Sequence, residues 1–178
     1  MSRDWEKYWG SAEWAAAQTT ERGKLEAELV DTLRASQNAT QQMDEAAHAA
    51  MGISSSEGRC LDVIDRLGRV PAGTLAKEAG LTSGAMTGVL DRLEEKGYAR
   101  RVPDPDDRRK VLVEITEKQR EAAMRLYWPL KEMSDDWIEQ RTVKELGLLV
   151  EFHRISREIN ERRAAEIRAE LEGGSVDS

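Results

Sequence analysis

The sequence has few residues that could cross-link or anchor the chain. Cys60 is its only cysteine, which excludes an intramolecular disulfide, and nothing in the 178 residues resembles a signal peptide. No apolar run approaches the ~20 residues that a membrane-spanning helix requires. His48, Cys60 and His153 lie far apart in the chain, so no transition-metal site is expected. These absences predict a cytoplasmic protein that is not inserted in a membrane and has no metal site.

Features of an enzyme are equally scarce. Neither histidine has a serine, cysteine or carboxylate partner at an informative spacing, and no glycine-rich loop could cradle a phosphate. With 39% hydrophobic residues, 34% charged residues and only four prolines, the composition is typical of a soluble helical protein. We therefore expect a protein that is not an enzyme and uses no cofactor.

Charge is unevenly distributed along the chain. The formal net charge is −7, of which residues 1–56 contribute −4, residues 57–116 contribute zero and residues 117–178 contribute −3. The middle segment ends in a cluster of seven basic residues: Arg92, Lys96, Arg100, Arg101, Arg108, Arg109 and Lys110. Such a local patch could bind phosphate groups although the chain as a whole is acidic.

Helical periodicity begins at Glu21. Leucines recur every four residues at 25, 29 and 33, and Gly52 is a suitable stop for this first long helix. Ser54 and Glu57 form a capping box, which predicts a second helix that closes at Gly68. Residues 70–73 are expected to form a connector and residues 74–80 a short third helix.

The fourth helix has an unusual exposed side. Thr82 is a suitable N-cap, and Gly97 is suitable just beyond the C-terminal end. The apolar stripe consists of Met86, Val89, Leu90 and Leu93, and the opposite side of Ser83, Gly84, Thr87, Gly88 and Asp91. Each glycine inside a helix costs about 1 kcal/mol relative to alanine, which suggests that another molecule approaches this backbone closely.

The pattern then changes to that of a β-hairpin followed by two helices. Residues 98–102 and 111–115 are predicted strands, and the proline, aspartate and arginine residues between them are typical of a hairpin tip. A capping box at Thr116 and Gln119 opens the next helix, in which Pro129 predicts a kink or a break. A box at positions 142 and 145 opens the last long helix.

The predicted elements have the order of a winged helix-turn-helix: a helix, a short helix, a third helix and a charged hairpin. Two runs make the resemblance specific: Val89-Leu90-Asp91-Arg92-Leu93-Glu94, and Pro103-Asp104-Pro105-Asp106-Asp107-Arg108-Arg109. Together they resemble the multiple antibiotic resistance regulator (MarR) family, with Asp107-Arg108-Arg109 as the most telling part. The similarity covers about residues 53–121, and the helical order extends it to Leu171. The first twenty residues lie outside the family pattern, and Gly58 stands where a large apolar residue is more usual.

The resemblance implies a mainly α fold with a small β-hairpin wing (α+β), a winged helix-turn-helix with long N- and C-terminal dimerisation helices. Together with the sequence pattern, it divides the chain into five parts. They are a tryptophan-rich arm (1–20), a dimerisation helix (21–52), a DNA-binding lobe (53–116), C-terminal dimerisation helices (117–172) and a disordered tail (173–178). It also implies a homodimer, with a small aromatic or lipophilic effector bound between the dimerisation helices and the DNA-binding lobe.

The expected DNA-binding residues belong to the recognition helix and to the basic cluster. They are Thr82, Ser83, Gly84, Thr87, Gly88, Arg92, Arg100, Arg101, Arg108, Arg109 and Lys110. No Asn, Gln, Arg or Lys lies on the exposed side between Ser83 and Asp91, so we expect modest base readout, with DNA shape and phosphate contacts supplying much of the energy. Ordinary capping and surface roles are the alternatives for these residues.

The hairpin tip fits a wing that lies along the minor groove, whose negative potential favours arginine. We expect Asp107 to pair with one arginine and stiffen the loop. The resemblance favours Arg108 as the groove residue and Arg109 as the structural one. The alternative is a solvated turn whose charges simply pair.

The effector site is predicted from aromatic and polarisable side chains on helices that border the family's pocket. They are His48, Cys60, Tyr127, Trp128 and Trp137. Packing in the core or in the dimer interface is the alternative for each, and Cys60 could also be an oxidation sensor. The aromatic residues of the arm, Trp5, Tyr8, Trp9 and Trp14, either pack on the body or cover a pocket or subunit contact.

The resulting hypothesis is a ligand-responsive repressor. It would bind a pseudo-palindromic, double-stranded DNA operator as a homodimer and be associated with the nucleoid when DNA-bound. The alternative is a winged-helix module for protein interaction or ligand sequestration without specific DNA binding.

Overall fold

The computed structural model describes residues 11–107 and 110–174. Trp5, Tyr8 and Trp9 of the predicted arm, the side chain of Trp14, Arg108 and Arg109 of the predicted wing, and residues 175–178 of the predicted tail lie outside this description. The chain forms two compact units, Met1–Ala122 and Ala123–Ser178, which are described in turn.

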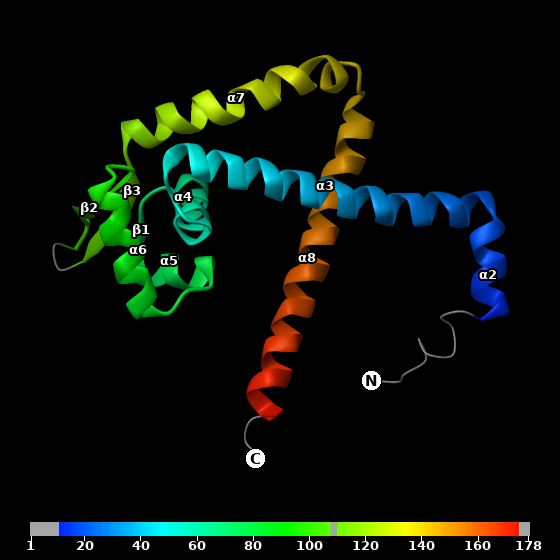
Figure 1. The fold of residues 1–178 in the computed structure, drawn as a ribbon, viewed down its shortest axis with the longest axis horizontal. Helices are drawn as coiled ribbons and strands as arrows, with labels where there is room; N and C mark the ends of the chain where they lie inside the picture. The colour runs from blue at the N-terminus through cyan, green and yellow to red at the C-terminus, as the bar shows by residue number, and fades with distance from the viewer. Residues whose placement is uncertain (1–10, 108–109, 175–178) are drawn as a thin grey trace. The chain divides into compact units, whose positions relative to one another are not determined.

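The first unit contains five helices and a small sheet among its described residues (Figure 1). In chain order they are α2 (Ala12–Thr19), α3 (Glu21–Met51), α4 (Ser55–Leu67), β1 (Val70–Pro71), α5 (Ala72–Ala79), α6 (Ser83–Glu95), β2 (Ala99–Pro103) and β3 (Val111–Ile115). The mainly α fold with a β-hairpin wing is thus confirmed.

A sharp break separates α2 from α3. The Thr20 side chain accepts a hydrogen bond from the Gly23 amide and caps α3. Gly23 is buried, and a β-carbon there would lie 1.9 Å from the Ala17 carbonyl oxygen, so only glycine allows α2 to pack this closely. The predicted start of α3 at Glu21 and its stop at Gly52, which has a φ of 65°, are confirmed.

The core of this unit lies between α4, α5, α6 and the sheet. Its fully buried side chains include Cys60 and Ile64 of α4, Leu75 of α5, Leu90 and Leu93 of α6, and Val113 of β3. The predicted capping box is present, because Ser54 and Glu57 exchange hydrogen bonds at the start of α4. The core therefore fixes α6 by its predicted apolar stripe.

The sheet has the strand order β1-β3-β2, with both pairings antiparallel. The predicted connector at residues 70–73 is wrong, because Val70 and Pro71 pair with Val113 and Leu112 as β1, and α5 already begins at Ala72. A strand of two residues is too short to show the alternation of apolar and polar residues by which strands are predicted from sequence. Pro71 is tolerated because β1 is an edge strand.

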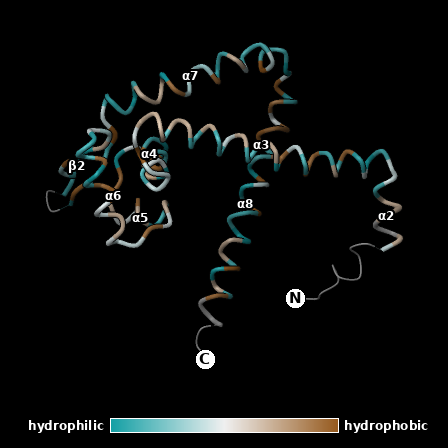
Figure 2. Tube along the Cα trace, viewed as in Figure 1, coloured by the Kyte–Doolittle hydropathy of each residue, from teal (hydrophilic) through white to brown (hydrophobic). Residues whose placement is uncertain are grey.

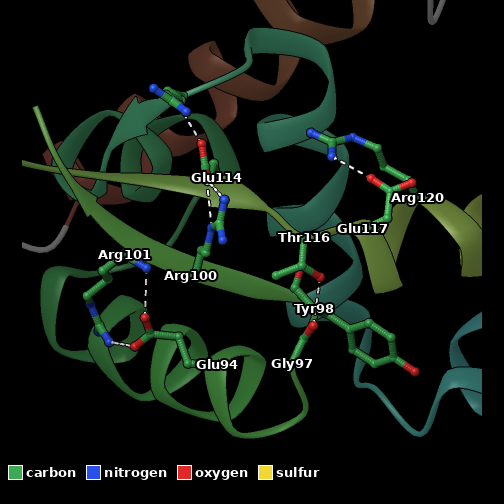
Figure 3. A network of polar contacts seen from close by, with 10 residues as sticks. Glu94, Gly97, Tyr98, Arg100, Arg101, Glu114, Thr116, Glu117 and Arg120 are labelled. Atoms are coloured by element: carbon green, nitrogen blue, oxygen red, sulfur yellow. Dashed lines mark hydrogen bonds and ion pairs between the residues drawn. The ribbon is translucent and has the colours of Figure 1, made fainter. Parts of the chain in front are cut away.

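The wing strands differ slightly from their predicted bounds. The Tyr98 amide donates to the Leu93 carbonyl oxygen at 2.9 Å and so completes the end of α6, which shifts β2 by one residue to Ala99–Pro103. The predicted strand over 111–115 is confirmed as β3. Thr116 then bridges the sheet and α6 through its hydroxyl, which donates to the Gly97 carbonyl oxygen (Figure 3).

The last two helices are α7 (Glu117–Glu139) and α8 (Val143–Gly174). The break allowed for at Pro129 does not occur, since one missing hydrogen bond does not end a helix of 23 residues. The capping box at Thr116 is only half formed: Thr116 accepts from the Gln119 amide, but Gln119 Oε1 is buried without a partner in the described part of the chain. The box of Thr142 and Glu145 is complete.

Large apolar side chains remain exposed on the long helices. Hydrophilic and hydrophobic residues alternate along α3 and α8 in Figure 2. Exposed examples are Leu25, Leu29 and Val30 on α3 and Leu148, Val150, Ile159 and Leu171 on α8. Each long helix thus presents apolar surface that its own unit does not cover.

Candidate nucleic-acid interface

The exposed side of α6 is as open as the sequence predicts. Thr82 caps the helix by accepting from the Ala85 amide, and Gly97 ends it with a φ of 74°. A β-carbon at Gly84 would meet nothing within 4 Å, and one at Gly88 would meet only Arg92 Nη1, at 3.4 Å. The folded chain itself therefore does not require glycine at either position.

The hydroxyl group of Thr87 is partly engaged within the helix. Thr87 Oγ1 donates to the Ser83 carbonyl oxygen at 3.2 Å. Its hydroxyl can therefore accept a further hydrogen bond, and its methyl group stays available for apolar contact. Thr87 is exposed, so both groups face solvent on the open side of α6.

One flank of α6 is fastened to the wing. Glu94 accepts a hydrogen bond from the Arg101 backbone amide at 2.7 Å and also pairs with the Arg101 guanidinium (Figure 3). Arg101 Nη2 in addition lies 2.8 Å from Asp91 Oδ1. Burial alone would lower the pKa of Arg101, but the bonds to Asp91 and Glu94 outweigh it and raise the pKa. Arg101 thus joins β2 to α6.

The other flank of α6 is fastened to α4 by Glu57. This carboxylate is 1% exposed and binds Arg92 Nε and Lys96 Nζ, each at 2.9 Å. Burial by itself would raise the pKa of Glu57, but the Ser54 amide and the two cations outweigh it and lower the pKa from 4.5 to about 2. The sequence suggested a capping role for Glu57 but not this second one.

A second carboxylate, Glu114 of β3, holds two arginines across the sheet. It pairs with Arg100 of β2 at 2.6 Å (Figure 3). It also pairs with Arg69, which precedes β1. The hydrogen bonds from Arg100 and Arg69 lower the pKa of Glu114. Neither Glu114 nor Arg69 is among the residues singled out from the sequence, because their contact spans 45 positions.

The wing turn is organised by Asp104. Its Oδ1 accepts from the Asp106 and Asp107 amides at 2.8 and 3.3 Å, and the Lys110 amide donates to the Asp107 carbonyl oxygen. The Asp107 carboxylate lies 3.7 Å from Lys110 Nζ. Its predicted pairing with a wing arginine falls outside the described residues.

Two of the predicted effector residues lie in the first unit. Cys60 is fully buried, and burial raises the pKa of its thiol to about 11. His48 of α3 packs on Gly58 of α4 so closely that a β-carbon at position 58 would lie 2.0 Å from its Nε2. The absence of a large apolar residue at Gly58 is thereby explained, because the imidazole occupies that space.

The other three effector residues lie in the second unit, on α7. Trp128 and Trp137 are half exposed, with Lys131 and Arg141 over their respective rings, and Tyr127 is partly buried. Trp137 also lines a groove that belongs entirely to this unit. The groove is formed by Trp137, Ile138, Leu146, Leu149, Val150, His153, Arg154 and Arg157.

The described residues hold no group of three or more His, Cys, Asp or Glu side chains placed to bind a metal. Within the same residues, no helix is both long enough and apolar enough to cross a membrane.

A three-stranded wing behind a capped helix with an open face defines a winged helix-turn-helix protein. Comparison with known proteins then identifies its family. Residues 53–111 match the MarR family model. The HTH-type transcriptional regulator YcgE of Bacillus subtilis is 33% identical over 131 residues, which are 74% of this chain and 85% of YcgE. The chain therefore belongs to the MarR family of transcriptional regulators, a family of DNA-binding proteins rather than of enzymes.

Solved structures agree with this assignment. The transcriptional regulator PA4135 is 26% identical, with a TM-score of 0.52 over 74% of this chain and 96% of that chain. FabT of Streptococcus pneumoniae, solved in complex with DNA, is 25% identical, with a TM-score of 0.57 over 76% of this chain and 97% of FabT.

Proposed function

We propose that this protein is a ligand-responsive repressor that binds a pseudo-palindromic operator as a homodimer. The observation that carries the proposal is how α6 is held. Glu57 and Arg101 bind its two flanks, and the face that contains Gly84 and Gly88 stays open. A rigid helix with an open face suits the major groove, which is about 12 Å wide. The DNA complex of FabT, a relative by fold and sequence, supports the same use of this chain.

Phosphate contacts supply most of the binding energy in this proposal. Arg92, Arg100, Arg101 and Lys110 surround α6 and the wing, and each is paired with a carboxylate that orients it. Arg108 enters the minor groove beside the wing, and Arg109 has the structural role. Specificity then comes from DNA shape together with Thr82, Ser83, Thr87 and the close approach at the two glycines.

Dimerisation covers the exposed apolar surfaces of the long helices. Monomeric proteins rarely expose large contiguous apolar patches. Among the described residues, α3, α7 and α8 carry most of the exposed large apolar side chains. A two-fold dimer places two recognition helices in successive major grooves, about 34 Å apart. The operator is therefore pseudo-palindromic, and the complex is nucleoid-associated in the cytoplasm.

The effector is a small aromatic or lipophilic compound. Exposed Trp128 and Trp137, each beside a cation, favour a planar ligand with an anionic group. Such a ligand releases the DNA if it binds better to a dimer in which the two lobes have a different separation. Full burial of Cys60 favours a packing role for this residue over oxidation sensing.

The experiment starts from duplexes that the wild-type protein selects from a random-sequence pool. Fluorescence anisotropy then compares a selected duplex with a shuffled one across a range of salt concentrations. We expect preferential binding, a log affinity that falls linearly with log salt, and two half-sites about one helical turn apart. Equal binding to both duplexes at physiological salt contradicts the proposal.

A double variant separates a DNA-binding regulator from a protein-interaction or sequestering module. Arg108→Ala with Arg109→Ala should abolish selective binding of the duplex. Arg162→Ala with Arg163→Ala removes the same charge from α8 and is the matched control. If the wing variant still binds the duplex as the wild type does, the wing has no part in DNA recognition.

A further inference from the structure

Glu57 joins the helix that begins the lobe to the helix that faces DNA. Its two oxygens are shared among the Ser54 amide, Arg92 Nε and Lys96 Nζ, at distances of 2.6, 2.9 and 2.9 Å. The carboxylate is 1% exposed, whereas the Arg92 side chain is 50% exposed. A buried anion therefore holds the inner edge of a guanidinium whose outer edge faces solvent.

The outer edge of Arg92 lies on the open side of α6. Its hydrogen bond to Glu57 is made through Nε, and half of the side chain is exposed. Nη1 would lie 3.4 Å from a β-carbon at Gly88, one turn earlier in the helix, so the guanidinium lies against this glycine. Its two Nη groups form the planar fork that matches phosphate oxygens.

The position of Arg92 along the helix favours a phosphate over a base. The N-terminal residues of a recognition helix reach deepest into the groove. Arg92 lies nine positions after Ser83, which corresponds to about 14 Å along a helix axis. A side chain so far from the N-terminal end is therefore expected near the sugar–phosphate backbone rather than at the base edges.

We propose that Glu57 is a positioning residue for DNA binding, which orients Arg92 so that its terminal nitrogens bind a DNA phosphate. This assignment rests on the proposed function, because it requires that α6 faces DNA. The three side chains Glu57, Arg92 and Lys96 together carry one net positive charge, so Glu57 orients the cations without cancelling their attraction for phosphate. Lysine at position 92 could bind the carboxylate or the phosphate but lacks the fork that binds both.

The test uses the full-length protein and a duplex selected by the wild type from a random pool. Affinity is measured across salt for the wild type, Glu57→Gln, Arg92→Ala, Arg92→Lys and the double variant Glu57→Gln with Arg92→Ala. Glutamine keeps the size of the side chain and one acceptor for the Ser54 amide. Thermal unfolding of each variant provides the folded fraction, so that a folding defect is separated from a binding defect.

We expect each single variant to lose at least tenfold in affinity and Arg92→Ala to lower the salt slope by about one. The double variant should bind no more weakly than Arg92→Ala alone, because Glu57 acts through Arg92. If Glu57 acted only by stabilising the fold, the double variant would instead bind more weakly than Arg92→Ala. Glu78→Gln is the matched control, because it breaks the exposed Arg66–Glu78 pair between α4 and α5 and should change affinity less than twofold.

Three results overturn the assignment while leaving the proposed function intact: wild-type affinity of Glu57→Gln, wild-type affinity of Arg92→Lys, or additive losses in the double variant. If the wild type selects no duplex, the proposed function fails, and the assignment of Glu57 fails with it.

Discussion

Glu94 binds Arg101 through both the backbone and the side chain of the arginine, so that β2 is fastened to α6 at two points (Figure 3). The Arg101–Asp91 pair is a further contact between the same strand and helix. Antiparallel pairing with β3 holds β2 from its other side. The two contacts with Glu94 therefore contribute to the placement of the wing against α6.

Removal of Glu94 should affect DNA binding more than folding. Glu94→Ala is expected to cost about 1 kcal/mol in the free energy of unfolding, because it loses one backbone hydrogen bond and one partly exposed ion pair. The affinity for a selected duplex should fall severalfold, because the wing loses two of its contacts with α6 and keeps only the Arg101–Asp91 pair among its Arg101 contacts. Glu95→Ala removes the same charge from an exposed neighbour, and an equal effect of both variants would contradict this expectation.

Alanine at the two open glycines should stabilise the protein and weaken its binding to DNA. Gly84→Ala and Gly88→Ala should each raise the free energy of unfolding by about 1 kcal/mol, because neither new β-carbon is closer than 3.4 Å to any other side chain. The same β-carbons stand between the α6 backbone and the groove. Denaturant unfolding and anisotropy on each variant measure the two effects.

Gly73→Ala is the control for these glycine variants. A β-carbon at Gly73 in α5 also meets nothing within 4 Å, and Gly73 lies outside the proposed DNA-binding and dimerisation surfaces, so a gain in stability is expected without loss of DNA affinity. Unchanged affinity in Gly84→Ala and Gly88→Ala would show that no molecule approaches this part of α6 closely.

Acid should weaken the fold through Glu57. Its pKa is about 2 in the folded protein and near 4.5 in the unfolded chain, so the unfolded state binds the proton first as the pH falls. The stabilisation, about 3 kcal/mol from the shift, is complete above pH 4.5 and is lost as the pH falls towards 2. Unfolding of the wild type and of Glu57→Gln between pH 6 and 2 should show a flatter profile for the variant, and parallel profiles would contradict the prediction.

Cys60 should be chemically inert in the native protein. The thiol is fully buried and its pKa is raised to about 11, so almost no thiolate is present at neutral pH. Its reaction with a thiol-specific reagent at pH 8 should be at least a hundredfold slower in the native protein than in denaturant. Mild peroxide should leave duplex affinity unchanged, and a loss that Cys60→Ala prevents would instead indicate an oxidation sensor.

Local rules predicted the ends of the helices well. The αL residues Gly52 and Gly97 and the cap residues Ser54 and Thr82 act within a few positions of themselves, so their signals are complete in the sequence. The short strand β1 was missed because its pairing with β3 depends on a segment more than 40 residues away.

The partners of the basic cluster were not predictable for the same reason. The Glu57–Arg92 contact spans 35 positions and the Arg69–Glu114 contact spans 45, and each forms only when α4, α6 and the sheet pack together. The sequence shows where the positive charges lie. It does not show that buried carboxylates orient Arg92 and Arg100, which is the feature on which the proposed phosphate contacts depend.

The packing of His48 on Gly58 restricts how this protein could have diverged from its relatives. The joint between α3 and α4 has room for one large side chain, and the imidazole already fills it. A relative with a large apolar residue at position 58 must carry a smaller residue, or a ring turned away, at position 48. We therefore expect the two positions to change together among relatives, because a large residue at position 58 beside His48 overfills the joint and a small residue at position 48 beside Gly58 leaves a cavity.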